Sequence, residues 1–449
     1  MRKRALLACL VAMVMVLSSC ALVEKDLAVD NASVIIELGD KTVTKAQVSS
    51  MLEYQLYYQS VMYSMYGMSY DTTDKQIRAS ALESVLQYMT ENLVKEAKAE
   101  ALGFNIITEE EDKAIKETAQ KDFDSAKESV KTSEFAESTL EGEELDKAIV
   151  ARMAEVGQTY EAYYESAKSE AIMEKLRQSV IADVSVSDDE IKTEYDSRVA
   201  SAKTSYESNL SSYGSSVNSN GTVYYAPAGY RYVKHILRGF TEESKTAISD
   251  LNSKITGKTS EITSVDTSIA GLGADVAADN PDLVSFNAQK ATLEKEKADL
   301  EAQLAQAKEK AYAELMPTVE EIQGKLTAGE DFSALMEQYG EDPGMEVSPQ
   351  KENGYAICEG FSSFDPAFTQ AAMALEKVGD VTAPVQGENG IHIIQYAADI
   401  PEGPVALETV KDTIFSELLT NKQDETFTAQ VTAWVAESGV KVHKEFLDE

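Results

Sequence analysis

Apolar side chains recur at helical spacing through the first half of the chain. Residues 72–102 carry them at intervals of three and four, which predicts an amphipathic helix that ends at Gly103. Thr108, with Glu111 three positions later, has the spacing of a capping box and predicts the start of another helix. Further helices are predicted over 45–66, where Thr44 can act as the N-cap, over 158–184, and over 188–209, which begins with three acidic residues. Apart from a short strand at 33–38, this half is therefore expected to be α-helical.

The second half mixes helical spacing with short apolar runs that end at glycine or proline. Such runs are typical of strands in a small sheet. Strands are predicted near 230–240, 354–358, 381–385 and 390–397, and helices over 317–327, 331–340, 366–376 and 405–437. The expected fold class is therefore α+β, with a mostly helical first half and a small antiparallel sheet with flanking helices in the second.

Two segments interrupt this pattern. Residues 207–221 are rich in Ser, Asn and Gly, which predicts a flexible linker and a domain boundary. Residues 241–311 carry two apolar seams, the first with one polar break at Lys258, on either side of Asn280-Pro281, which suits the start of a helix. We expect an antiparallel helical hairpin that projects about 40 Å; the alternative is a single interrupted helix.

The N-terminus has the order of a targeting segment. Basic residues at positions 2–4 precede an apolar run over 5–17, which is too short for a comfortable transmembrane helix. Leu17-Ser18-Ser19-Cys20 follows and resembles a bacterial lipobox, in which the chain is cut before the cysteine and the cysteine is lipidated. The prediction is a signal peptide over 1–19 and a lipidated Cys20 with a tether over 20–32. An ordinary secretory signal and an uncleaved anchor are the alternatives.

Charge and composition exclude several classes of protein. The 449 residues have a net charge of −36, which argues against nucleic-acid binding and against attachment to an anionic membrane through a basic patch. Three cysteines and three histidines are too few for a disulfide scaffold or a His-rich metal site, so no metal and no cofactor is expected. The chain also lacks a phosphate-binding loop, a CxxC pair, a zinc-protease helix and the nucleophile elbow of a hydrolase.

An ordered series of short motifs lies in the second half. It consists of Lys234-His235-Ile236-Leu237, Gly329-Glu330-Asp331-Phe332, Tyr339-Gly340-Glu341-Asp342, Gly354-Tyr355, Phe364-Asp365-Pro366-Ala367-Phe368, Gly379-Asp380-Val381 and Gly390-Ile391-His392-Ile393-Ile394. This series resembles the parvulin family of peptidyl-prolyl isomerases over 229–400, with 241–311 as an insertion. The stretch from Phe364 to Ile394 carries the resemblance most specifically.

The resemblance implies a site without a nucleophile, metal or cofactor. His235 and His392 match paired histidines on adjacent strands, and Asp342 matches the position of a Cys or Asp that faces the twisting amide. These three are the expected catalytic residues. The expected substrate-binding residues are Phe364, Phe368, Ala356 and Asn389. The alternatives are a structural histidine pair and two core phenylalanines.

The order of segments resembles extracytoplasmic foldases of the PrsA/SurA type. The resemblance implies a helical chaperone domain over 33–206, a linker over 207–228, the parvulin domain, and a C-terminal helical segment over 401–449 that packs on the chaperone domain. The expected function is a bacterial, lipid-anchored isomerase and chaperone outside the cytoplasm, whose partners are unfolded secreted polypeptides with X-Pro bonds. A holding chaperone with an inactive parvulin domain is the alternative, and a structural coiled-coil lipoprotein fits less well. The sequence leaves the oligomeric state open.

Tyrosine and methionine gather in the first predicted helix and just beyond it, at Tyr54, Tyr57, Tyr58, Met62, Tyr63, Met65, Tyr66 and Met68. This group is either an internal helix face or an adaptable surface for clients, because both residue types suit promiscuous contacts. Cys358 is expected to pack in the core, and His443 to lie at the surface.

Overall fold

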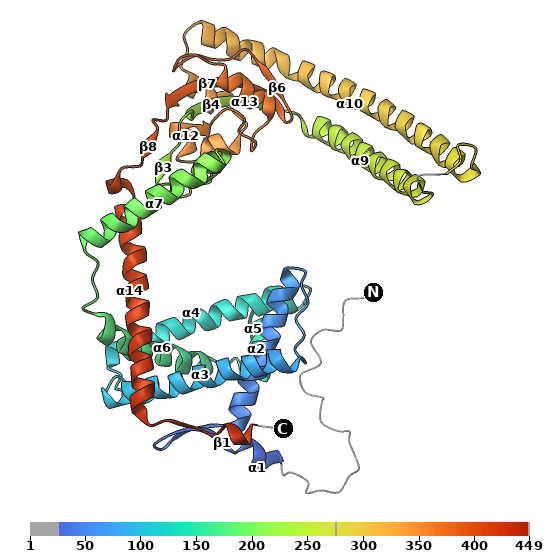
Figure 1. The fold of residues 1–449 in the computed structure, drawn as a ribbon. Helices are drawn as coiled ribbons and strands as arrows, with labels where there is room; N and C mark the ends of the chain where they lie inside the picture. The colour runs from blue at the N-terminus through green and yellow to red at the C-terminus, as the bar shows by residue number, and fades with distance from the viewer. Residues whose placement is uncertain (1–26, 274–275, 448–449) are drawn as a thin grey trace. The chain divides into compact units, whose positions relative to one another are not determined.

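The computed structural model describes residues 27–273 and 276–447, and the chain forms two compact units (Figure 1). Unit 1 comprises the chain up to Ser185 and from Leu418 onward, and unit 2 comprises Val186–Glu417. The predicted signal peptide and Cys20 lie outside the described residues, and only the end of the predicted tether is described, as the short helix α1 (Leu27–Asn31). Among the described helices, none is long and apolar enough to cross a membrane.

Unit 1 is built from helices with a small antiparallel sheet. Its further helices are α2 (Lys45–Met65), α3 (Lys75–Ala101), α4 (Glu109–Glu134), α5 (Gly142–Glu155) and α6 (Tyr160–Ile181). The predicted capping box is present at the start of α4: the Glu111 N–H bonds the Thr108 hydroxyl at 3.3 Å, and the Thr108 N–H bonds the Glu111 carboxylate at 2.8 Å. Such reciprocal bonds satisfy two donors that a helix N-terminus otherwise leaves free.

The C-terminal segment from Leu418 belongs to the same unit as the N-terminal helices. Strand β1 (Val34–Leu38) lies between β2 (Lys41–Thr44) and the late strand β9 (Lys441–Val442). The long helix α14 (Leu407–Ser438) runs through the boundary between the units, and within unit 1 its Asp424 pairs with Arg177 at 2.7 Å. The two ends of the chain therefore build one compact unit.

Unit 2 is organised around a four-stranded antiparallel sheet in the order β5-β4-β7-β6. The strands are β4 (Arg231–Gly239), β5 (Tyr355–Ile357), β6 (Val385–Gly387) and β7 (Gly390–Asp399), and a second pair consists of β3 (Tyr225–Ala226) and β8 (Gly403–Pro404). The helices are α7 (Asp188–Ser208), α8 (Ser211–Asn218), α9 (Glu242–Gly271), α10 (Pro281–Thr327), α11 (Phe332–Tyr339), α12 (Gln350–Asn353) and α13 (Pro366–Met373), with a 3₁₀ turn η1 at Pro343–Glu346.

The central sheet carries a separate hydrophobic core on each face. Val233 and Ile394 belong to a cluster with the aromatic residues around β5 and α13, whereas Ile236 and Ile393 pack with α10 and α11. This division follows from the two-residue period of strands, which turns successive side chains to opposite faces. Both faces are covered, so the first five residues of β7 are all buried.

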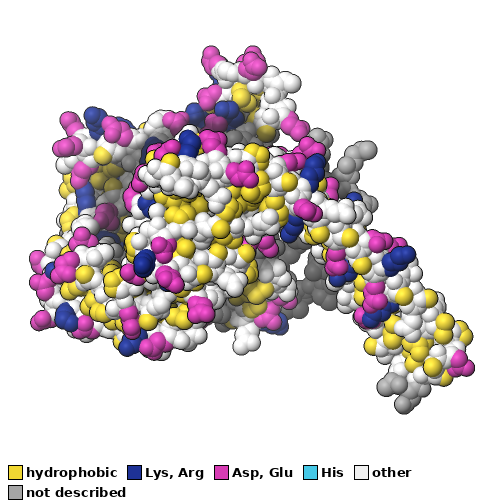
Figure 2. Space-filling view, turned by 90° about the horizontal axis from the view of Figure 1, so that it is seen from above, with side chains coloured by type: hydrophobic (Ala, Val, Ile, Leu, Met, Phe, Trp, Pro, Cys, Tyr) yellow, Lys and Arg dark blue, Asp and Glu magenta, His cyan; other side chains and the backbone are white. Residues whose placement is uncertain are grey.

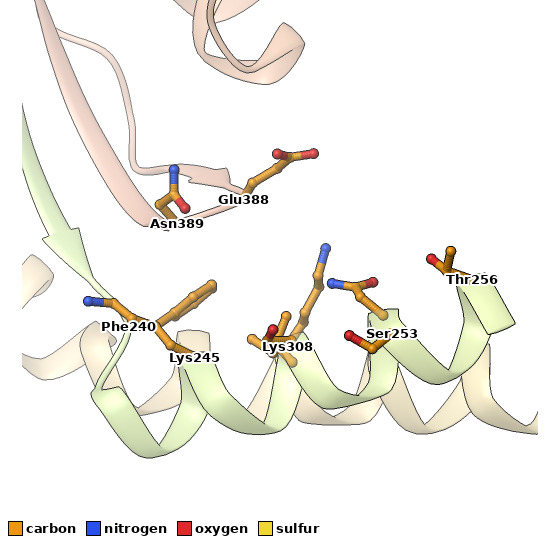
Figure 3. Close-up of a pocket in the computed structure, with 10 residues that line it drawn as sticks. Phe240, Lys245, Ser253, Thr256, Lys308, Glu388 and Asn389 are labelled. Atoms are coloured by element: carbon orange, nitrogen blue, oxygen red, sulfur yellow. The ribbon is translucent and has the colours of Figure 1, made fainter. Parts of the chain in front are cut away.

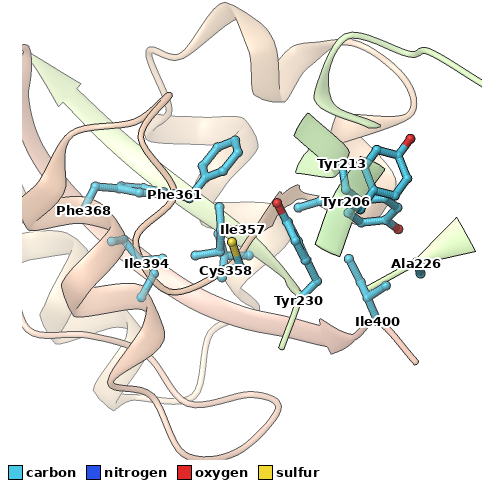
Figure 4. Close-up of a cluster of buried hydrophobic side chains, with 13 residues drawn as sticks. Tyr206, Tyr213, Ala226, Tyr230, Ile357, Cys358, Phe361, Phe368, Ile394 and Ile400 are labelled. Atoms are coloured by element: carbon cyan, nitrogen blue, oxygen red, sulfur yellow. The ribbon is translucent and has the colours of Figure 1, made fainter. Parts of the chain in front are cut away.

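The predicted linker over 207–228 is instead folded into unit 2. Helix α8 contributes the buried Tyr213, which meets Tyr206 and Tyr230 edge-on at ring distances of 5.5 and 4.7 Å (Figure 4). The Asn218 side chain bonds both the N–H and the carbonyl of Ala356, at 2.8 and 3.0 Å, as a strand partner would. The composition, rich in Ser, Asn and Gly, suggested a flexible segment. Composition alone does not show that Tyr213 and Asn218 have fixed partners in the fold.

The insertion forms the predicted helical hairpin. Helix α9 packs along α10, and Lys258, the polar break in the first seam, pairs across the hairpin with Glu296 at 2.9 Å. At the base of the hairpin, the Tyr312 ring lies 5.1 Å from the Phe240 ring, and the Tyr312 hydroxyl donates a hydrogen bond to the Gly387 carbonyl at 2.9 Å. Figure 3 shows Phe240 beside α9. The hairpin is thus fixed to the sheet and to the turn between β6 and β7.

A separate helix beginning near residue 317 was predicted, and that prediction is wrong. Helix α10 continues through Pro317 for a total of 47 residues. A proline inside a helix removes one backbone hydrogen bond and crowds the preceding turn. Leu315, Val319 and Ile322 on either side of it are buried in the core beneath the sheet, and their burial offsets that cost.

Acidic side chains are spread over the surface rather than gathered in one place. Figure 2 shows Asp and Glu on all parts of the visible face, interspersed with fewer Lys and Arg. Many of the basic residues are in ion pairs at helical spacing, such as Lys192 with Asp196 at 2.6 Å. Exposed pairs of this kind contribute about 0–1 kcal/mol each, so the acidic surface affects solubility and long-range attraction more than folding.

Candidate functional site

Two buried histidines lie on the central strands of unit 2. His235 on β4 pairs with Ile394 in the antiparallel register, and His392 on β7 pairs with Leu237. The two histidines are therefore diagonal neighbours on one face of the sheet, where side chains of this length meet. Their Nδ1 atoms are 3.1 Å apart. The structure thus brings together the two histidines that the sequence singled out.

Asp342 extends this pair into a line of three groups. It caps the turn η1, where one carboxylate oxygen accepts the Gly344 N–H at 3.0 Å. The other oxygen lies 2.7 Å from His235 Nε2 and accepts the Tyr355 hydroxyl at 2.9 Å. The carboxylate of Asp342 therefore accepts three hydrogen bonds, and its direction is fixed by groups on three different elements.

This arrangement sets the tautomer of each ring. A carboxylate only accepts hydrogen bonds, so the proton between Asp342 and His235 lies on His235 Nε2. When both rings are neutral, His235 Nδ1 is then an acceptor, and the proton between the two facing nitrogens must lie on His392 Nδ1. Asp342 thus orders both imidazoles, one directly and one through its neighbour.

The ionisation of the site follows from burial and these contacts. Burial, assisted by the neighbouring His235, lowers the pKa of His392 to about 4. For Asp342, burial raises the pKa, but the hydrogen bond from His235 and the other donors outweigh it, so that pKa is lowered. Burial and the Asp342 carboxylate raise the pKa of Tyr355 well above its usual range. Near neutral pH the site therefore holds a carboxylate, a neutral His392 and a protonated phenol.

A hollow of about 510 Å³ opens beside the histidine line. Its apolar wall is aromatic: the Phe364 ring lies 5.6 Å from Phe368 and 4.9 Å from Tyr355. Phe368 is only 4% exposed and meets both histidine rings edge-on at 5.1 and 5.2 Å. The hollow is thus a slot with an aromatic wall and one polar side, and its volume suits a small ring and its neighbouring peptide groups.

Besides His235 and His392, four of the five other predicted site residues line this hollow. Asp342, Phe364, Phe368 and Asn389 line it. Ala356 does not: its side chain is fully buried in the core behind β5, and Tyr355 lines the hollow instead. Adjacent residues of a strand face opposite ways, so an uncertainty of one position in the register exchanged these two.

Sequence reasoning also missed Gly387, at the end of β6. A β-carbon at this position would lie 2.7 Å from His392 Nε2 and 3.0 Å from the Asp365 carboxylate. Only glycine lets the backbone approach the imidazole this closely. The sequence offered no signal for this role, because the contact joins separate elements.

The arrangement suits the binding and orientation of a peptide segment. Among residues 27–273 and 276–447, no cluster of three or more His, Cys, Asp and Glu side chains could hold a metal ion. The groups present supply an apolar slot and an ordered line of hydrogen bonds. Such a site favours a change of shape in a bound amide more than bond cleavage.

Part of unit 2 matches a known protein family. Residues 287–398 match the family model of the rotamases, described as the PPIC-type PPIASE domain. This segment of the chain is similar to the PPIC-type peptidyl-prolyl isomerase family. The rotamase match begins within α10 and leaves out β4, which carries His235; the structure places β4 between β5 and β7 in the same sheet.

Curated relatives of the rotamase segment are foldases. The chain is 32% identical over 130 residues to the foldase protein PrsA of Clostridium botulinum, which is 28% of this chain and 37% of that protein. It is 40% identical over 117 residues to the foldase protein PrsA 4 of Bacillus cereus, which is 26% of this chain and 39% of that protein. The match therefore spans well under half the length of these relatives.

Solved structures of similar proteins cover most of the chain at low similarity. PrsA from Bacillus subtilis is 16% identical, with coverage of 91% of this chain and 92% of that chain and a TM-score of 0.22. A SurA-like chaperone of Campylobacter jejuni is 10% identical, with coverage of 91% and 98% and a TM-score of 0.26.

Proposed function

We propose that unit 2 catalyses cis/trans isomerisation of X-Pro bonds in polypeptide clients. The observation that carries the proposal is the aromatic slot of Phe364 and Phe368 directly beside the line His392–His235–Asp342. The rotamase segment contributes all of these residues except His235, which β4 supplies from the neighbouring strand.

The reaction requires only that the peptide bond be twisted. Amide resonance makes the rotation barrier about 18–20 kcal/mol, and the uncatalysed exchange takes tens of seconds or longer. Rotation destroys that resonance, so a site that holds the proline ring still and keeps water from the amide favours the twisted form. In this chain Phe364 and Phe368 would grip the ring, and the histidine line would form the polar side of the slot.

Asp342 would act mainly by positioning. Both of its oxygens already accept hydrogen bonds, from His235, Tyr355 and Gly344. These bonds hold the carboxylate against the histidines. They support a role in ordering the histidines over a role in which the carboxylate acts directly on the electrons of the twisting amide.

Unit 1 would hold unfolded clients. Tyr54, Tyr57 and Tyr66 on and after α2 are 64%, 66% and 73% exposed, which argues against an internal helix face. Large apolar groups exposed in a row suit contacts with many different chains. The opposing candidate, a holding chaperone with an inactive isomerase domain, rests on the same surface and differs only in the chemistry of the slot.

The chain would work outside the cytoplasm, anchored by a lipid on Cys20. The lipobox-like Leu17-Ser18-Ser19-Cys20 supports this part of the proposal. A palmitate analogue supplied to cells should label the wild-type protein and leave Cys20→Ser unlabelled. Equal labelling of the two proteins would refute the anchor at this residue.

The isomerase proposal is tested with a proline tetrapeptide and residues 21–449, beside Asp342→Ala and Phe368→Ala. We expect activity in the parent and a loss of at least about ten-fold in each variant, because the first disorders the histidines and the second removes the wall of the slot. Circular dichroism controls for folding. A folded but inactive parent would instead favour the holding chaperone, and aggregation assays with unfolded clients would then measure its function.

A further inference from the structure

A second hollow adjoins the isomerase slot. It has a volume of about 770 Å³ and lies between the base of the α9–α10 hairpin and the turn that joins β6 to β7. Glu388 and Asn389 on that turn line both hollows. Figure 3 shows these two residues facing the side of the hairpin that carries Lys308 and Ser253. A chain that leaves the slot past this turn therefore enters the second hollow, which we call the hairpin groove.

The hairpin groove is a fixed part of unit 2. The Phe240 N–H donates to the Asn389 carbonyl at 3.0 Å, and the Tyr312 hydroxyl donates to the Gly387 carbonyl at 2.9 Å. Ile248 on α9 is buried in the core together with residues of β7. These contacts hold both walls of the groove, so its shape does not depend on a loosely attached arm.

Polar side chains line one wall at helical spacing. Ser249, Asn252, Ser253 and Thr256 occupy positions i, i+3, i+4 and i+7 of α9 and thus share one face. Hydroxyl and amide groups both donate and accept hydrogen bonds, so they suit the N–H and carbonyl groups of an extended chain. Phe240 and Ile248 supply an apolar floor between them.

The groove also holds an unpaired cation. Lys308 is partly buried there and forms no ion pair with any residue that the structure describes, whereas Lys245 at the rim pairs with Glu242 at 2.7 Å. Two positions along α10, Lys310 is not among the lining residues of the groove and pairs with Glu314. Glu388 also lines the groove but forms no ion pair with Lys308, so this partly buried lysine is placed to receive a carboxylate from a ligand.

We propose that the hairpin groove binds the client segment that flanks the X-Pro bond and selects for an acidic side chain there, with Lys308 as the partner of that carboxylate. This inference rests on the proposed isomerase function of the slot. Hollows of about 510 and 770 Å³ are each roughly 8–9 Å across, and an extended chain rises about 3.3 Å per residue. The selected residue therefore lies roughly three positions from the proline.

The test uses ten-residue peptides with one Ala-Pro bond and a single Glu, or Gln in its place, two to four positions before or after the proline. The measured quantity is the ratio of kcat/KM for the Glu peptide to that for the Gln peptide. At the favoured position we expect a ratio of about two to five in the wild type, the range of a partly exposed ion pair, and a ratio near one at high salt. Lys308→Gln should bring the ratio to one, and the matched variant Lys310→Gln should leave it unchanged.

Failure of this proposal is distinct from failure of the isomerase proposal. If the tetrapeptide is isomerised but the Glu/Gln ratio is one at every position, or is the same in Lys308→Gln as in the wild type, the hairpin groove does not select acidic segments. If no peptide is isomerised, fluorescence anisotropy of the same labelled peptides gives the ratio of binding constants. A Lys308-dependent preference would then uphold the groove without catalysis, and its absence would refute it.

Discussion

Replacement of Asp342 by Asn should reverse the proton order of both site histidines. An amide NH₂ in place of the carboxylate oxygen that faces His235 Nε2 presents a donor where that nitrogen now donates. The favourable response is for His235 to move its proton to Nδ1, and His392 must then carry its own proton on Nε2. The substitution keeps the size of the side chain, so it isolates the hydrogen-bond pattern from packing.

The structure also gives a magnitude for this change. The affected oxygen accepts from His235 Nε2 and the Tyr355 hydroxyl at 2.7 and 2.9 Å, and hydrogen bonds to a charged acceptor are worth about 1.5–3 kcal/mol each. Because both donors can reorient and pair with the amide, we expect a net loss of about 2 kcal/mol of unfolding free energy. The lowered pKa of Asp342 means that the carboxylate stabilises the fold above the usual aspartate pKa. The difference between wild type and variant should therefore shrink as the pH falls through the pKa of the folded protein.

The assay is nitrogen NMR of the histidine rings at about pH 8, where imidazoles are ordinarily neutral. The wild type should show His392 as the Nδ1–H tautomer and His235 as Nε2–H, and Asp342→Asn should show both exchanged. Urea unfolding gives the free-energy difference. His392 as Nε2–H in the wild type, or unchanged tautomers in the variant, would refute the ordering role of Asp342.

Three further predictions concern the close approach at Gly387, the ionisation of His392 and the tyrosines of unit 1. Gly387→Ala should lower kcat/KM about ten-fold or more with the fold retained by circular dichroism, because its β-carbon would displace the His392 ring; unchanged activity would show that this close approach is unimportant. The pKa of about 4 for His392, against 6.5 for the free side chain, predicts that stability falls by about 3 kcal/mol as the pH drops from 6.5 to 4, since the unfolded chain binds that proton first. In urea titrations His392→Gln should lack this loss, and a loss of equal size in the variant would assign it elsewhere. Replacement of Tyr57, Tyr63 and Tyr66 by Ser should abolish protection of an aggregating client with the fold retained, and unfolding of the variant would show that these side chains pack internally.

Local signals were sufficient to predict two of the helix starts. The capping box of Thr108 and Glu111 and the start of α10 at Asn280 and Pro281 depend on groups within four residues of one another, and both are present. By contrast, the continuation of α10 through Pro317 depends on burial against a sheet built from other segments. Propensity at a single residue does not contain that information.

The candidate site also depends on contacts between separate segments, which local sequence signals do not contain. Its side chains come from β4, η1, β5, α13 and β7, and only the likeness to a known family predicted that His235, Asp342 and His392 would meet. Tyr355 was exchanged with Ala356 because a strand register uncertain by one position reverses the side that each residue faces.

The central claim is tested most directly by exchange NMR on an unmodified Ala-Pro peptide with the isotope-labelled protein, residues 21–449. This measurement observes cis/trans exchange without a coupled protease and locates the bound peptide at the same time. The account predicts accelerated exchange together with shifts at Phe364, Phe368 and His392 that saturate with peptide. Exchange at the uncatalysed rate, or acceleration with the shifts confined to residues outside the slot, would contradict it.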